Sequence, residues 1–244
     1  MGLPKVSTAT YELEIPSTGK KVSYRPFLVK EEKQLLMAME SSDTKVMAKA
    51  MKNIVSACTE ETLQMDELAP FDLEYFFLHL RGKSVGDVIK IQMKRPPAVD
   101  CCEESIEEDT HQIEIAVDDV EVDTSKMVSP DIQVTKDIGV KLKYPGFEEV
   151  QLMSTDGELK AEAIFKMIIS CIDYITEGDD VYKAKDHTSK ELNDFLESLN
   201  SEQFLHIREF FEGMPRLRHE VNWDCPKCKK SSPVMLEGLE SFFG

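Results

Sequence analysis

One short stretch near the end of the chain constrains the fold more than any other. Leu217, His219, Val221 and Trp223 alternate with charged or polar residues, which is the period of a half-buried β-strand, and the motif Cys225-Pro226-Lys227-Cys228 follows directly. Residues 234–239 supply a return strand, so the stretch predicts a β-hairpin with two cysteines at its turn. This arrangement is typical of one half of a zinc ribbon, and a structural zinc ion needs four ligands. The remaining ligands must come from another part of the chain.

A second pair of cysteines lies in the middle of the chain. Residues 88–94 and 113–117 both alternate between apolar and polar side chains, and Cys101 and Cys102 lie in the loop between these two predicted strands. Bringing the two cysteine-bearing loops together supplies four thiols for one metal ion. We therefore predict a structural zinc ion held by Cys101, Cys102, Cys225 and Cys228.

The adjacency of Cys101 and Cys102 leaves alternatives open. Neighbouring cysteines bind one metal only with strained geometry, because the usual two-residue gap keeps the ligand angles tetrahedral. His111 or His219 is therefore a candidate replacement for one thiol. A pair of metal-free hairpins with reduced cysteines is the other interpretation. A redox role for the Cys-x-x-Cys motif is disfavoured, because such motifs usually lie between a strand and a helix.

The sequence lacks the common catalytic motifs. His219-Glu220 is not followed by a second histidine four residues later, which excludes the zinc-protease helix, and there is neither a Gly-x-Ser-x-Gly elbow nor a glycine-rich dinucleotide loop. Cys58 and Cys171 fall on apolar helix faces, so we interpret both as buried core thiols. We predict that the protein is not an enzyme.

The charge of the chain limits its partners. A net charge of -17 repels phosphate backbones, so we expect no nucleic-acid partner. The acidic runs 103–109 and 118–123 are interpreted as solvated loops. No apolar run reaches the roughly 18 residues of a membrane span, and no signal peptide is recognisable, so we expect no membrane partner and a location in the cytoplasm.

The remaining periodicity predicts an α+β fold, with helical N- and C-terminal regions around a central antiparallel β region that carries the zinc-ribbon-like element. The expected regions are 1–84, a β-arm and helices; 85–150, the central β region with its ribbon-like loop; and 151–244, helices ending in the Cys-x-x-Cys hairpin. Helices are predicted at 29–41, around 47–58, at 70–80 with Gly82 just past the end, and at 158–175, 189–199 and 201–211, with further strands at 132–134 and 138–144.

The sequence also resembles a known family, the baseplate hub assembly proteins of T4-like contractile-tailed bacteriophages, including relatives carried by cyanophages. The matching segments span nearly the whole chain: the arm around Tyr11-Glu12-Leu13, the run 24–33, the segment 71–75, residues 139–145, and the ending from Cys225 to Phe243. The family pattern implies a Cys-x-x-Cys in the first ribbon loop, where this chain has Cys101-Cys102.

The resemblance implies a role in building the central hub of the phage tail baseplate. Members of the family are expected to act in the host cytoplasm during assembly, by binding hub or tape-measure proteins, and a structural subunit retained in the virion baseplate is the alternative. A zinc-ribbon regulatory protein is a further alternative. We also hypothesise that apolar edges, either the Phe242-Phe243 tail or residues 24–29, dock onto the partner, and that removal of residues 241–244 leaves the fold intact.

Overall fold

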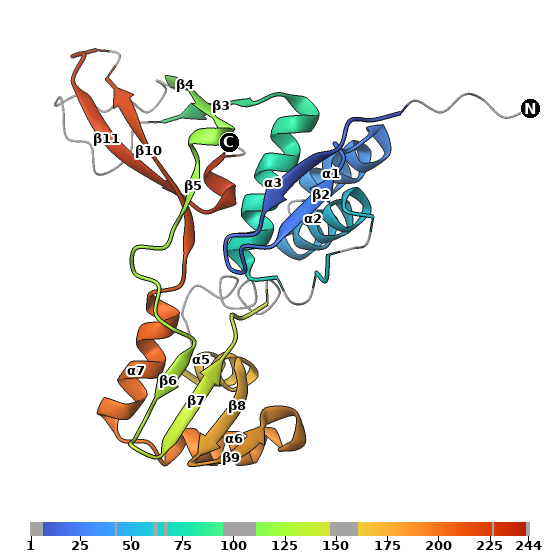
Figure 1. Ribbon diagram of the computed structural model, residues 1–244. Helices are drawn as coiled ribbons and strands as arrows, with labels where there is room; N and C mark the ends of the chain where they lie inside the picture. The colour runs from blue at the N-terminus through green and yellow to red at the C-terminus, as the bar shows by residue number, and fades with distance from the viewer. Residues whose placement is uncertain are drawn as a thin grey trace, which may run out of the picture. The chain divides into compact units, whose positions relative to one another are not determined.

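The computed structural model describes residues 7–41, 43–60, 63–65, 68–94, 111–146, 161–225 and 227–242. Helices and exclusively antiparallel strand pairs occur in these ranges, which confirms the α+β class (Figure 1). The chain divides into two compact units. Unit 1 comprises Met1–Met65, Phe71–Asp123 and Arg216–Gly244, and unit 2 comprises Asp66–Pro70 and Thr124–Pro215.

The three consecutive regions expected from the sequence do not follow this division. The first two, at 1–84 and 85–150, share unit 1 up to Asp123, and the final hairpin returns to that unit from residue 216 onward. The physical reason is strand pairing: the first residues of the last hairpin pair with a strand at Glu121–Asp123, far away in sequence.

Unit 1 begins with a β-hairpin that is followed by helices. These elements are β1 (Tyr11–Glu14), β2 (Lys21–Tyr24), α1 (Val29–Ser41), α2 (Thr44–Cys58) and α3 (Pro70–Val85). The turn of the hairpin is fixed to α3, because the buried carboxylate of Asp72 accepts hydrogen bonds from the Ser17 backbone N–H at 3.0 Å and from the Ser17 hydroxyl at 2.5 Å. Tyr24 packs edge-on against Phe76, with 5.1 Å between the ring centroids.

Helix α3 continues past the glycine that was expected to follow it. The sequence pattern places Gly82 just beyond the helix, but α3 extends to Val85. Gly82 is tolerated inside the helix because Val117 lies against it: an added Cβ would stand 3.2 Å from a Val117 methyl group. A small residue at this position therefore allows close packing of α3 against the segment that follows β4.

The rest of unit 1 is built largely from β-strands. The elements are β3 (Val88–Met93), β4 (His111–Ala116), η1 (Val117–Asp119), β5 (Glu121–Asp123), β10 (Arg216–Asp224), β11 (Ser231–Glu237) and η3 (Leu239–Phe242). β3 pairs with β4, and a second sheet has the order β11-β10-β5. The hairpins predicted at both cysteine-bearing loops are thus confirmed as pairs of strands.

The acidic run 118–123 is solvated at Asp118, Asp119 and Glu121, as predicted, but it is not a loop. Its last residues form β5, where Asp123 pairs with Arg218 of β10 at 2.6 Å. Arg218 also pairs with Glu237 of β11 at 2.7 Å, so one arginine links three strands. Asp123 therefore serves as a cross-strand partner of a cation that is far away along the chain.

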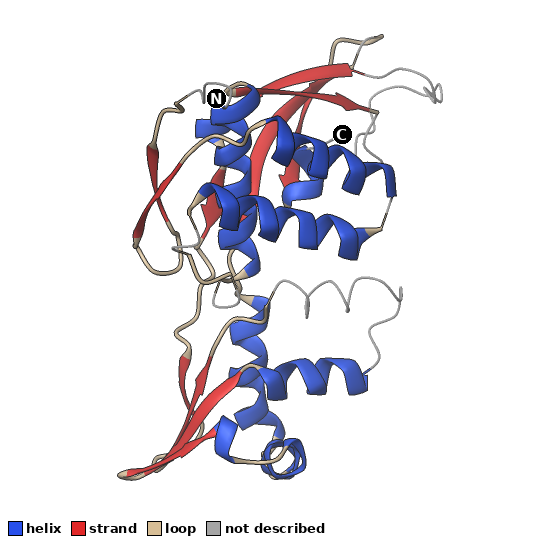
Figure 2. Ribbon diagram, turned by 90° about the vertical axis from the view of Figure 1, so that its right-hand side faces the viewer, coloured by secondary structure: helices blue, strands red, loops and turns tan. Residues whose placement is uncertain are grey.

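Unit 2 has a four-stranded antiparallel sheet with helices packed on one of its faces (Figure 2). Its elements are β6 (Asp131–Gln133), β7 (Ile138–Leu142), α5 (Ala161–Ser170), β8 (Ile172–Glu177), β9 (Asp180–Lys183), η2 (Ala184–Asp186), α6 (Ser189–Glu197) and α7 (Ser201–Glu212). The strand order is β6-β7-β8-β9. Buried residues of the sheet and helices, including Val140, Ile172, Leu196 and Phe210, form one continuous core.

The helix predicted at 158–175 is only partly correct. Within the part that the structure describes, α5 ends at Ser170, and residues from Ile172 onward form the β8–β9 hairpin. A register shift opposite Lys141 and Leu142 places a bulge in β8, so Ile172 and Ile175 both contact the core although they are three residues apart. On a regular strand, residues three apart point to opposite faces, so two apolar residues at this spacing are not expected to share one core. The bulge brings them to the same face, and the resulting sequence pattern looks helical.

Two glycines of unit 2 allow features that other residues would strain. Gly178, with φ +57°, occupies the first position of the two-residue turn between β8 and β9, as in type II′ hairpins. Gly213 ends α7, where an added Cβ would collide with the Lys126 carbonyl oxygen.

Among the described helices of the chain, none is long and apolar enough to cross a membrane.

Candidate functional site

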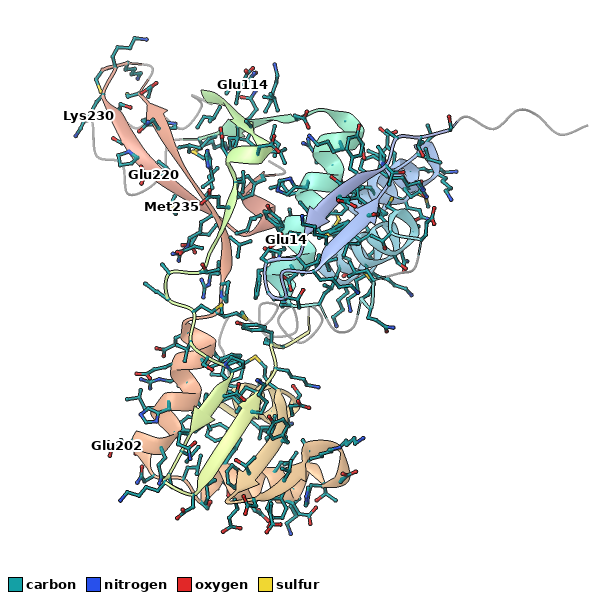
Figure 3. All side chains as sticks on the ribbon, viewed as in Figure 1. Glu14, Glu114, Glu202, Glu220, Lys230 and Met235 are labelled. Carbon is teal, nitrogen blue, oxygen red and sulfur yellow. The ribbon has the colours of Figure 1, made fainter. Side chains whose placement is uncertain are left out.

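The turn between β10 and β11 has the local geometry of a metal-binding knuckle. The Cys228 N–H donates to the Cys225 sulfur across 3.5 Å, and the Lys229 N–H donates to the Cys225 carbonyl at 2.9 Å. Lys229 has φ +61°, which turns the chain back toward β11. A backbone amide that points at a cysteine sulfur stabilises a thiolate, which is the form that binds metal. Lys230 stands at the outer end of this hairpin (Figure 3).

The other two predicted ligands, Cys101 and Cys102, lie outside the described residues. They belong to the connection between Met93 and His111, which pair with each other at the loop end of the β3–β4 hairpin. Because β5 is antiparallel to the start of β10, the chain that precedes β5 leads back along β10 toward the end where Cys225 follows. Among the residues that the structure does describe, no group of three or more metal-ligating side chains occurs.

His219 does not share a site with Cys225. The two residues lie six positions apart on or next to one strand, which separates them by about 20 Å at the usual rise per residue. The His219 Nδ1 is also within 3.0 Å of the Asp119 carbonyl oxygen. The geometry therefore does not support the alternative in which His219 replaces one thiol, and the side chain of His111 lies outside the described set.

The two remaining cysteines are core residues, as their positions on apolar helix faces predicted. Cys58 and Cys171 are each 1% exposed. Burial is the largest influence on Cys58 and raises its pKa to about 11, even though the nearby Arg25 acts in the opposite direction. Cys58 is therefore a neutral thiol at physiological pH and a poor nucleophile or metal ligand.

The two apolar edges that were expected to dock onto a partner are largely internal. Phe242 is fully buried, so this half of the Phe242-Phe243 tail belongs to the core of unit 1, and removal of residues 241–244 is expected to damage the fold. Phe243 lies outside the described residues. In the run 24–29, Tyr24 and Phe27 are buried, whereas Val29 is 79% exposed.

Helix α1 carries exposed apolar side chains beyond its first residue. Leu36 is 54% exposed, Met37 60% and Met39 44%, whereas Leu35 and Ala38 of the same helix are buried. The helix therefore presents apolar surface outside the core as well as inside it. Exposed apolar side chains that gather on one element are typical of protein interaction surfaces.

A further exposed methionine lies on the last hairpin. Met235 of β11 is 49% exposed and pairs in the register with Glu220 of β10, and both are labelled in Figure 3. It stands among polar and charged neighbours on this strand pair. A single exposed apolar side chain of this kind is ordinary on a protein surface and indicates no site by itself.

A buried histidine in unit 1 combines several polar neighbours. The ring of His79 in α3 lies 4.3 Å from the ring of Tyr75, and its Nδ1 is 3.9 Å from a carboxylate oxygen of Asp118. Its Nε2 is buried and has no hydrogen-bond partner among the described residues. Burial lowers the pKa of His79 more than Asp118 raises it, so the imidazole is neutral at physiological pH.

Unit 2 has a small pocket that no sequence motif indicated. It has a volume of about 240 Å³ and lies where α6 meets the β7-β8-β9 part of the sheet. Its lining residues are Ile138, Ile175, Glu177, Tyr182, His187, Glu191, Leu192 and Phe195. Ligand pockets for cofactors are usually larger, at roughly 300–1,000 Å³, so this one fits a single large side chain better than a cofactor.

Comparison with known proteins finds relatives that span nearly the whole chain. The family described as "T4 bacteriophage base plate protein" matches residues 8–244. The baseplate hub assembly protein gp26 of Enterobacteria phage T4 is 24% identical over 235 residues, which cover 96% of this chain and 97% of that protein. No solved structure matches the chain.

Proposed function

The chain belongs to the T4 bacteriophage base plate protein family, and from this membership we propose that it is an assembly factor of the tail baseplate hub. It acts by binding hub or tape-measure proteins and carries out no catalysis. The observation that carries the proposal is the end-to-end match with a protein named as a baseplate hub assembly protein, because almost the full length of each chain is aligned.

The character of the surface supports a role in protein binding. The net charge of -17 favours solubility, and exposed apolar residues on α1 and on β9 offer contact areas. The same charge disfavours the zinc-ribbon regulatory protein as an alternative, since a regulator that binds DNA needs a basic surface. We propose that the protein acts in the host cytoplasm while baseplates are assembled.

A structural subunit retained in the mature baseplate hub is the second candidate, because the family description names a baseplate protein rather than an assembly step. The two roles differ in copy number in the finished particle. Quantitative mass spectrometry of purified virions separates them: an assembly factor is absent, whereas a structural subunit is present at a fixed number of copies per tail.

We further propose that Cys101, Cys102, Cys225 and Cys228 hold a structural zinc ion. The knuckle geometry of the turn at Cys225 and Cys228 supports this proposal. So does the direction of the chain before β5, which leads back along β10 toward Cys225. A zinc ion bound there would join two hairpins that are far apart in sequence and so stabilise unit 1.

The binding role is tested by isolating an affinity-tagged chain from infected cells and identifying the proteins that co-purify with it. We expect hub or tape-measure proteins to be enriched over a parallel purification from cells that produce the untagged chain. Enrichment must survive nuclease treatment, since the proposal excludes nucleic acid as the bridge. Absence of every baseplate protein from the purified material would contradict the proposal.

A further inference from the structure

We propose that the outer edge of β9, together with the adjacent pocket of unit 2, binds an extended basic segment of a partner protein that inserts one large aliphatic side chain. The inference rests on the proposed function for the identity of that partner as a baseplate protein. The recognition chemistry itself follows from the strand, the pocket and the local charge.

The strand β9 forms one edge of the unit 2 sheet, and no other described strand pairs with its outer side. The β8–β9 hairpin has a two-residue turn, so the closing pair of Glu177 and Asp180 exchanges backbone hydrogen bonds. Hydrogen-bonded and non-bonded pairs alternate along antiparallel strands. The N–H and C=O groups of Val181 and Lys183 therefore point outward, where an added strand can accept and donate hydrogen bonds.

The edge of β9 carries one lysine, Lys183, but it is less protected than two other edge strands of the described sheets. β11 contains Pro233, which removes a backbone donor, and β6 has only 3 residues. β9 has no proline, and Val181 is 55% exposed and Tyr182 40% exposed. Exposed β-branched and aromatic side chains on an unpaired edge favour pairing with another strand.

The pocket lies on the helix-facing side of the same edge. Tyr182 pairs with Ile175 across the hairpin, and both residues line the pocket with Leu192 and Phe195 of α6. A volume of about 240 Å³ accommodates one leucine-sized side chain with space to spare. A strand added beside β9 would direct every second side chain toward this face of the sheet.

The charge around the pocket identifies the flanking residues of the partner segment. Glu177 and Glu191 line the pocket, and Glu191 is held ionised because the backbone N–H and the hydroxyl of Thr188 donate to its carboxylate at 2.7 and 2.8 Å, which lowers its pKa. The turn, β9 and η2 add further carboxylates at Asp179, Asp180 and Asp186. Lys183, Lys185 and Lys190 lie in the same stretch, so residues 177–191 carry five acids and three lysines, a net charge of -2. Lysine or arginine two residues before and after the inserted side chain would lie on the same face as these acids.

The test uses the full chain and a fluorescein-labelled peptide of sequence Thr-Lys-Thr-Leu-Thr-Lys-Thr, in which lysine, leucine and lysine share one face. Fluorescence anisotropy is expected to show saturable binding. Replacing the leucine by alanine should weaken binding about tenfold, because it removes most of the buried apolar area. A peptide with glutamate in place of both lysines should bind more weakly still, because its charge is repelled.

Two variants of the chain locate the binding. Val181→Pro removes an outward N–H without removing a bond of the β8–β9 ladder, and it should weaken binding about fivefold, whereas Val181→Thr should change it less than about twofold. Glu177→Lys should weaken binding of the lysine peptide and strengthen binding of the glutamate peptide. Because Glu177 is exposed, this second variant keeps the test valid if Val181→Pro fails to fold.

The outcomes separate this inference from the proposed function. If baseplate proteins co-purify with the chain but the lysine peptide does not bind, or binds Val181→Pro and Glu177→Lys as tightly as the unsubstituted chain, the β9 site is overturned and the proposed function stands. If the peptide binds as expected and no baseplate protein co-purifies, the β9 site stands and the proposed function falls.

Discussion

Arg25 donates a hydrogen bond to the buried carboxylate of Glu31 over 2.9 Å, and this pair joins the end of β2 to the first turn of α1. Arg25 also donates to the Ala57 carbonyl at 3.1 Å, which adds the end of α2. The run of residues 24–33, one of the segments that resemble the family, therefore has a structural role in unit 1. Removing Glu31 leaves Arg25 without the carboxylate that it binds, whereas removing Arg25 leaves Glu31 only the exposed Lys30, at 3.2 Å, as a counterion.

We predict that Glu31→Gln lowers the free energy of unfolding by about 3 kcal/mol. Burial opposes the ionisation of Glu31, but hydrogen bonds from Arg25, the Leu28 N–H and Lys30 outweigh it and keep the pKa of Glu31 below its ordinary value. Urea denaturation at pH 7 measures the loss, and Glu32→Gln, at an exposed neighbour, is the matched control. Equal stability of the two variants would show that the Arg25–Glu31 pair contributes nothing.

The buried His79 predicts a pH dependence of stability. Its pKa in the folded protein is lowered, chiefly by burial, whereas the unfolded chain titrates near the ordinary value of about 6.5. Between these two values the unfolded state binds a proton that the folded state does not, so stability is full above about pH 6.5 and falls as the pH decreases below it.

A series of urea denaturation curves between pH 7.5 and 5 checks this dependence. The variant His79→Leu should show a flatter profile than the unsubstituted chain over this range, whereas His206→Leu, at an exposed site, should keep the original slope. If His79→Leu keeps the pH slope of the unsubstituted chain, as His206→Leu should, His79 is not the group responsible for the pH dependence.

The buried position of Phe242 predicts that the end of the chain is needed for folding. Phe242→Ala should lower the free energy of unfolding of unit 1 by about 3–5 kcal/mol, because it removes a large side chain from a packed core. Met235→Ala, at a side chain that is 49% exposed, is the control and should change stability by less than about 1 kcal/mol. A tail that served only for docking would leave Phe242→Ala as stable as the control.

The proposed zinc site predicts a defined metal content. The full chain purified from zinc-supplemented medium should contain about one zinc ion per chain by mass spectrometry of the metal. Cys225→Ser and Cys101→Ser should each lose the ion, whereas Cys58→Ala, at a buried core thiol, should retain it. Zinc that persists in both serine variants would contradict the assignment of ligands.

Local patterns in the sequence predicted most helices because their apolar faces match the core they contact. The helix at 29–41 coincides with α1, and those at 189–199 and 201–211 correspond to α6 and α7. Capping residues explain where α6 and α7 begin. Thr188 forms a reciprocal capping box with Glu191, and Asn200 forms one with Gln203.

The features that were missed depend on contacts between distant residues. The bulge in β8 made Ile172 and Ile175 look helical, and β5 is recognisable only through its pairing with the start of β10. In the candidate site, the Cys-x-x-Cys motif identified the turn at Cys225 without help from the fold. The pocket beside β9 was not predictable, because its walls come from β7, β8, β9 and α6.

Assembly of the baseplate hub in cells infected by a phage that lacks this gene tests the central proposal most directly. Sedimentation of the infected-cell extract, with the hub proteins followed by immunoblotting, measures whether they enter baseplates. We predict that the hub proteins remain in smaller or aggregated species and that a plasmid-borne copy of this chain restores their incorporation. Normal baseplates in the absence of the gene would contradict the proposed function.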